Sequence, residues 1–172
     1  MSFASDLKIW ENAQREFAKV LLDNTSEFRI VSIEFAQGKF KDWDIKIDCI
    51  PDWIITYEVK TDTMADKTWN FVIETRFKWE ASGIYASKAD YIVYCVKNER
   101  YIQKRGELIL RLIDTPKRTT KWWDWFNSEL YVISCDELDK LFTHLNTNPI
   151  NNGNEETGQS DRWDSTEVSW EI

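Results

Sequence analysis

Three residues near the middle of the chain have side chains suited to metal-assisted chemistry: Asp44, Glu58 and Lys60. Carboxylate oxygens are the ligands that Mg²⁺ prefers, and two of them with bound phosphate oxygens commonly complete such a site. A lysine beside them can orient or deprotonate an attacking water, or contact a phosphate. The three residues therefore predict a hard-cation site, provided that the fold brings them together.

A β-hairpin is predicted to do this. Residues 44–49 alternate polar with apolar side chains, and residues 53–60 are rich in Trp, Ile, Tyr and Val. Between them, Pro51-Asp52 is a strong turn signal. With the turn centred on Pro51, Asp44 is predicted to lie opposite Glu58, and Asp42 opposite Lys60.

Opposed residues share a sheet face, as do positions two apart on one strand. One face of the hairpin then carries Asp44, Glu58 and Lys60, with Asp42 and Asp48 nearby. The other face is apolar and suits a core: Ile45, Ile47, Cys49, Ile55, Tyr57 and Val59. The alternative interpretation of the polar face is a solvated surface, since antiparallel pairs commonly expose one face to water.

Asp44, a hairpin and then Glu58-Val59-Lys60 resemble the motif of the PD-(D/E)XK nuclease superfamily. The resemblance implies a helix, a three-strand meander, a helix and a further strand. It also implies that Asp44, Glu58 and the Val59 carbonyl bind Mg²⁺ or Mn²⁺, and that Lys60 is the catalytic lysine. The literal Pro51-Asp52 falls in the turn and is not this motif. Trp43, and not a proline, precedes Asp44, and many members of the superfamily lack that proline.

The first helix is predicted over residues 5–23, with Trp10 and Phe17 on its apolar side. Family members often add an acid from this helix to the metal site. Helical phase favours Glu16 over Glu11 for that ligand, because Glu16 lies nearer the apolar stripe. The alternative for either residue is a glutamate at the edge of the stripe with a solvated carboxylate.

A second stretch is similar to small phage-type members of the same superfamily. It contains Glu74 on a predicted strand, then Ser82 and Ser87-Lys88, and then a strand over residues 91–96 that is apolar enough to be buried on both faces. The resemblance implies that Lys88 binds phosphate during catalysis and that Ser82 or Ser87 supports it. Glu74 is a further candidate acid.

The charge is unevenly distributed along the chain. The net charge is −8, yet residues 97–121 are basic, and Arg100, Lys104 and Arg105 are candidate nucleic-acid contacts. A local basic strip can supply phosphate contacts whatever the total charge. The alternative is a solvated face of an ordinary element.

Composition and length predict one domain over residues 1–145, which the resemblance implies is nuclease-like, followed by an acidic, flexible tail over residues 146–172. The tail is a candidate segment for binding a protein partner. We find no signal peptide and no long apolar run, so we expect no membrane association and a cytoplasmic protein, including that of a phage-infected host cell. The three cysteines are widely separated and the chain has only one histidine, which does not suit a zinc site or a Cys-His nucleophile pair. We therefore expect the cysteines to be buried thiols.

The sequence therefore predicts an α/β fold, and the resemblance implies a restriction-endonuclease-like core, αβββαβ, with a mixed central sheet flanked by helices. The expected activity is Mg²⁺-dependent phosphodiester hydrolysis in nucleic acid, with DNA as the expected substrate, by an endo- or exodeoxyribonuclease. A homodimer is compatible with this superfamily. The alternative function is a non-catalytic module on the same fold that binds nucleic acid or protein.

Overall fold

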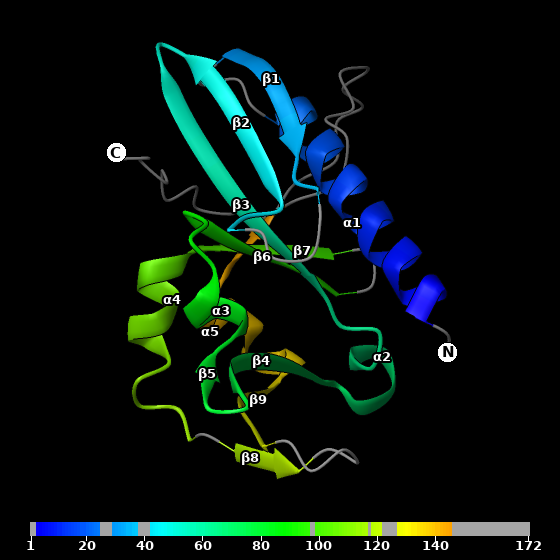
Figure 1. Ribbon diagram of the computed structural model, residues 1–172, viewed down its shortest axis with the longest axis vertical. Helices are drawn as coiled ribbons and strands as arrows, with labels where there is room; N and C mark the ends of the chain where they lie inside the picture. Colours follow the sequence, from blue (N-terminus) through cyan, green and yellow to red (C-terminus); the bar gives the residue numbers. More distant parts are fainter. Residues whose placement is uncertain are drawn as a thin grey trace, which may run out of the picture.

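A computed structural model describes residues 3–24, 29–37, 42–96, 99–116, 118–121 and 127–145 (Figure 1). The acidic segment 146–172 lies outside these ranges. Among the helices in the described ranges, none is long and apolar enough to cross a membrane. The structure is a mixed α/β fold in which two β-sheets and a long helix share the interior.

The first part of the chain folds as the hydrophobic pattern predicts. Helix α1 spans Phe3–Asn24, and strands β1, β2 and β3 span Arg29–Phe35, Ile45–Ile50 and Trp53–Thr61. In the β2–β3 hairpin Ile45 pairs with Tyr57 and Ile47 with Ile55, which confirms the predicted register. The turn at its tip contains a cis Ile50–Pro51 bond and is closed by the N–H of Asp52.

The central sheet has six strands in the order β1-β2-β3-β6-β7-β10. Strand β6 spans Tyr91–Val96, as predicted, and runs parallel to β3, whereas all other neighbours are antiparallel. The mixed central sheet is therefore confirmed. Strand β7 spans Glu99–Lys104 and β10 spans Thr143–Leu145.

Residues 135–145 divide into a helical part and a strand. A 3-10 turn at Cys135–Glu137 and the helix α5 at Leu138–Leu141 are followed by extended backbone at Phe142. Residues 143–145 then form β10, because hydrogen bonding to the open edge of β7 outweighs their weak helical preference.

A second sheet was not anticipated from the sequence. Its order is β5-β4-β9-β8, all antiparallel. The bounds are Asn70–Phe77 for β4, Glu80–Ala81 for β5, Arg118–Lys121 for β8 and Asn127–Ser134 for β9. Three short helices complete the described fold: α2 at Ala65–Thr68, α3 at Gly83–Ala86 and α4 at Arg105–Arg111. The basic strip thus becomes parts of β7, α4 and β8.

Two hydrophobic clusters lie on opposite faces of the central sheet. The first packs α1 against the sheet, with the rings of Phe17 and Tyr57 5.3 Å apart. The second lies between the other face, the second sheet, α4 and α5, and contains Phe71, Tyr94 and Phe142. Helix α1 therefore covers one face, as expected for a flanked sheet, but a second sheet covers much of the other (Figure 1).

Candidate active site at the open end of the central hairpin

Strand β3 extends past the start of β2, and this leaves part of its backbone without a strand partner on that side. The N–H of Asp44 donates to the Tyr57 carbonyl at 2.8 Å, so Tyr57 presents its backbone groups towards β2. Backbone groups two residues apart point to the same side of a strand. The N–H and C=O of Val59 therefore point to the space beyond the first residue of β2.

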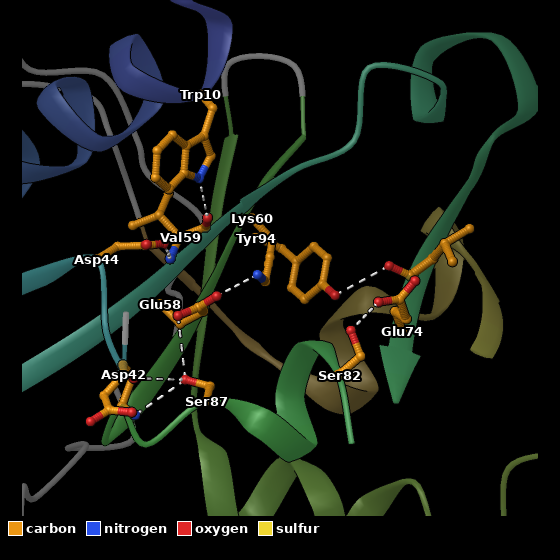
Figure 2. Close-up of polar contacts among 12 residues, drawn as sticks. Trp10, Asp42, Asp44, Glu58, Val59, Lys60, Glu74, Ser82, Ser87 and Tyr94 are labelled. Atoms are coloured by element: carbon orange, nitrogen blue, oxygen red, sulfur yellow. Dashed lines mark hydrogen bonds and ion pairs between the residues drawn. The ribbon is translucent and has the colours of Figure 1, made fainter. Parts of the chain in front are cut away.

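Two side chains satisfy these backbone groups (Figure 2). Asp44 Oδ2 accepts a hydrogen bond from the Val59 N–H at 2.7 Å. The indole Nε1–H of Trp10, from α1, donates to the Val59 carbonyl at 3.1 Å. Asp44 is 1% exposed, so its carboxylate is held against the backbone of β3 in place of a β2 residue.

Glu58 is the second acid of the predicted site and lies beside Val59 on β3. It is 8% exposed, and alternation along the strand turns it away from the α1 cluster that holds Tyr57 and Val59. The Lys60 ammonium donates to Glu58 Oε1, and the Ser87 hydroxyl lies 3.4 Å from Glu58 Oε2. Three of the predicted residues, Glu58, Lys60 and Ser87, are therefore in contact.

Asp42 does not occupy the predicted place opposite Lys60. The chain leaves the hairpin ladder at Asp44, because residues 42–44 turn towards the loop after α3. The Asp42 carbonyl accepts the N–H of Lys88 at 2.9 Å, and its carboxylate pairs with Lys88 Nζ at 3.1 Å. Lys88 is thus held next to Ser87 with a largely exposed ammonium.

Glu74 and Ser82 form a second polar pair across from Lys60, with Tyr94 between the two groups (Figure 2). The Ser82 hydroxyl donates to Glu74 Oε1, and the Tyr94 hydroxyl donates to the Val72 carbonyl at 3.2 Å. Burial, and then the negative charges of Asp62, Glu58 and Glu74, raise the pKa of Tyr94 far above its ordinary value. Its hydroxyl therefore stays protonated, so it acts as a hydrogen-bond donor and not as a base.

The two candidate acids of α1 do not share the side of the helix that reaches β3. Glu16 is exposed and pairs with Lys19 at 2.7 Å, and this hydrogen bond is the main reason that its pKa is lowered. At about 100° per residue, Glu16 lies about 120° around the helix from Trp10, and Glu11 lies about 100° away. The structure therefore brings Trp10, and not Glu16, to the site.

Trp10 was missed as a site residue because its position in the apolar stripe of the first helix indicates core. An indole also carries an N–H donor, which needs a partner when it is buried. That requirement is the signal in the sequence that could have marked Trp10 as a residue with a polar contact.

The basic residues of the predicted nucleic-acid surface are spread over more than one face. Arg100 and Lys104 flank Ile102 at intervals of two, and Ile102 belongs to the α1 cluster. They therefore lie on the α1 side of the central sheet, opposite Glu58 and Lys60. Arg105 begins α4 and donates its N–H to the Asp90 carbonyl at 2.8 Å. Ser82, Ser87 and Lys88 remain on the side of Glu58.

The oxygen ligands implied for a metal are Asp44, Glu58 and the Val59 carbonyl, which all come from one end of the hairpin. This donor set suits a hard cation such as Mg²⁺ or Mn²⁺. Within the described ranges, no group of three or more His, Cys, Asp or Glu side chains is placed to hold a metal ion. The fit therefore depends on two carboxylates and a backbone carbonyl.

The cysteines take no part in this arrangement. Cys49 and Cys95 are buried in the α1 cluster, and burial raises the pKa of the Cys95 thiol to about 11. All three cysteines are free thiols. Cys49 and Cys95 are buried, as predicted, whereas Cys135 is half-buried, so the prediction is wrong there.

Comparison of the chain with protein-family models, with curated proteins and with solved structures returned no match.

Proposed function

We propose that this protein is a divalent-metal-dependent nuclease that hydrolyses phosphodiester bonds in nucleic acid, with DNA as the first substrate to test. The observation that carries the proposal is the open end of β3. There, Glu58 and Lys60 lie in contact, and Asp44 is bound to the backbone of the residue between them. Two acids and a lysine at the end of a hairpin are the components that such a site requires.

The connectivity supports the restriction-endonuclease-like core. Helix α1, the meander β1-β2-β3, helix α3 and strand β6 follow one another in the expected order, and β6 lies parallel to β3. The elements α2, β4 and β5 are inserted between β3 and α3. This insertion supplies β4 and β5, and β8 and β9 from later in the chain complete the second sheet.

Asp44, Glu58 and the Val59 carbonyl would hold the cation, and Mg²⁺ or Mn²⁺ in that place would neutralise charge on the phosphate and acidify a water. Lys60 donates to Glu58, so its ammonium is positioned beside the carboxylate where it can orient the attacking water. The Ser87 hydroxyl, 3.4 Å from the same carboxylate, is a further donor.

Lys88 is proposed to bind a phosphate oxygen of the substrate. Its ion pair with Asp42 is solvent-exposed on both sides, and exposed ion pairs contribute little free energy, about 0–1 kcal/mol. Exchange of the Asp42 carboxylate for a phosphate therefore costs little. The backbone hydrogen bond from Lys88 to the Asp42 carbonyl keeps the loop in place during that exchange.

The test is a nuclease assay with Mg²⁺ or Mn²⁺ on single-stranded, duplex, flapped and junction substrates. We expect cleavage by the wild type and a loss of about a hundredfold or more in Asp44→Asn, Glu58→Gln and Lys60→Met. Asp52→Asn is the matched control, because Asp52 is an exposed acid in the turn of the same hairpin. Cleavage by the three site variants at the wild-type rate would contradict the assignment.

A second candidate function is a non-catalytic module on the same fold. It is favoured by two contacts, because Lys60 already binds Glu58 and Trp10 already binds the Val59 carbonyl. Thermal unfolding separates the two candidates. A metal ion at a concentration a hundredfold above its dissociation constant stabilises the folded state by about 2.7 kcal/mol. If the protein is an enzyme, Mn²⁺ should therefore raise the Tm of the wild type by several degrees and leave the Tm of Asp44→Asn unchanged. A binding module shows no shift in either protein.

A further inference from the structure

The tip of the β4–β5 hairpin has a backbone conformation that its residues do not favour. Phe77 pairs with Glu80, which leaves Lys78 and Trp79 as a two-residue turn with φ of 52° and 71°. Turns with positive φ at both central positions favour Asn-Gly, because most side chains other than those of Asn and Asp are strained there. The chain nevertheless has a lysine and a tryptophan at these positions.

Burial does not explain the tryptophan. Trp79 is 72% exposed, the largest exposed fraction among the exposed large hydrophobic residues of the described chain. Folding therefore gains little from the indole, and the strained turn costs stability. A large aromatic ring displayed at a strained, exposed tip is better explained by contact with another molecule.

The residues around the exposed indole include a cation. Arg76 and Lys78 flank the end of β4, and the Lys78 ammonium lies 5.3 Å over the ring of Phe77. Arg76 is paired with Glu129, with 3.8 Å between Arg76 Nε and Glu129 Oε2. Lys78 directly precedes Trp79 and supplies a cation next to the exposed indole.

The tip is also connected directly to the candidate active site. Strand β4 carries Glu74, and β5 leads into Ser82, α3 and Ser87. Trp79 follows Glu74 by five residues, which corresponds to roughly 15 Å of strand. That is about the length of four to five stacked nucleotides at 3.4 Å each.

We propose that Trp79 is a nucleic-acid contact that stacks on an unpaired base of a strand bound at Lys60 and Lys88. Indole rings beside cations stack on any unpaired base, whereas a base inside a duplex presents no free face. The preferred substrate class is therefore single-stranded nucleic acid or duplex with unpaired ends. The position of the strand depends on the proposed function, but the stacking contact does not depend on cleavage.

The test measures binding without cleavage. Fluorescence anisotropy of a labelled single-stranded oligonucleotide, and of the matching blunt duplex, is recorded in EDTA with wild type, Trp79→Ala and Trp79→Phe. Stacking contributes about 1–3 kcal/mol per base, so Trp79→Ala should weaken single-strand binding by about tenfold, and Trp79→Phe should keep most of it. Ile113→Ala, at another exposed apolar residue, should change nothing. Blunt duplex should bind all variants equally.

Trp79→Gly separates a contact from a structural role. Glycine adopts positive φ without strain, so the Tm of the Trp79→Gly variant should rise by about 2–4 °C. The affinity of this variant for single strands should fall as far as that of Trp79→Ala. A lower Tm for Trp79→Gly, or unchanged single-strand affinity in Trp79→Ala, overturns the proposal. The proposal is also overturned if Trp79→Ala loses equal affinity for duplex and for single strand, or if the wild type binds neither. If the variants bind as expected but the wild type shows no cleavage in the nuclease assay, the nuclease proposal alone is contradicted and the Trp79 contact is still supported.

Discussion

Two hairpins of this protein are held in place in different ways. The β2–β3 hairpin pairs five residues with five across its ladder, and its apolar side is buried under α1. The β4–β5 hairpin pairs only Arg76 with Ala81 and Phe77 with Glu80. The first carries its proposed chemistry at the open end, far from its turn, whereas the second carries its proposed contact in the turn itself.

Local pattern is enough to specify the first hairpin, but contacts at its base specify the second. After β5, the Ser82 N–H donates to the Thr75 carbonyl at 2.9 Å and the Ser82 hydroxyl binds Glu74. Gly83 then passes so close to β4 that a Cβ would lie 2.2 Å from the Glu74 carbonyl oxygen. The position of the β4–β5 hairpin thus depends on Gly83, because only a glycine allows the chain to pass this close to β4.

The largest expected effect is therefore at Gly83. Gly83→Ala adds a methyl group that meets backbone, at a position with φ of 49°, so we expect a loss of about 3 kcal/mol in the free energy of unfolding. Urea unfolding measures it. Hydrogen exchange should show lost protection in β4 and α3, with β2 and β3 unchanged.

The matched control is Gly106→Ala in α4, where a Cβ would meet nothing within 4 Å. In a helix this change should stabilise by about 0.5–1 kcal/mol. Equal effects of the two substitutions would remove the contrast between the hairpins, because Gly83 would then have no special role.

A smaller effect is expected at Thr56, which ties the first hairpin to the start of β6. Its hydroxyl donates to Asp90 Oδ2 at 2.7 Å and accepts the Asp90 N–H at 3.0 Å. Thr56→Val keeps the shape of the side chain and removes these hydrogen bonds, so we expect a loss of about 1 kcal/mol in urea unfolding. A loss as large as that of Gly83→Ala would show that the first hairpin also depends on a single tertiary contact.

The smallest effect is expected on the solvated face of the first hairpin. The Ser32 hydroxyl donates to Asp48 Oδ2 at 2.6 Å, and this hydrogen bond is the main cause of the lowered pKa of Asp48. Ser32→Ala should therefore raise the pKa of Asp48 towards its ordinary value, as measured by NMR titration of the carboxyl group.

The linked effect on stability has a defined sign. A carboxyl group with a lowered folded-state pKa stabilises the fold above its unfolded-state pKa, and this contribution is lost as the pH falls through the folded-state value. Wild type and Ser32→Ala should therefore differ slightly in stability at neutral pH and become alike in acid. An unchanged Asp48 pKa in the variant would assign the shift to Lys46 instead.

The elements with strong local signals were predicted from the sequence. The apolar stripe of α1, the alternation of β2, the turn at Pro51 and the apolar run of β6 each indicate one structure, and the hairpin register follows from the turn. The contact of Glu58 with Lys60 follows from the same register, because residues two apart share a face.

The remaining parts depend on contacts between distant segments. Strand β10 pairs with β7, and β9 with β4, across long stretches of chain, and no local pattern in residues 97–121 or 143–145 indicates these partners. Glu16 was favoured by helical phase, but the phase of a single helix does not show which side approaches β3. The contact of Trp10 with the Val59 carbonyl requires that information.

The two side-chain contacts to the Val59 backbone also bear on self-association of the protein. A strand whose N–H and C=O groups point outwards is a template onto which a neighbouring chain can add a strand, and this is how many sheets aggregate. At Val59 the carboxylate of Asp44 and the indole of Trp10 already take both groups. The same pair of side chains that shapes the candidate site therefore also keeps a neighbouring chain from pairing with the backbone of Val59.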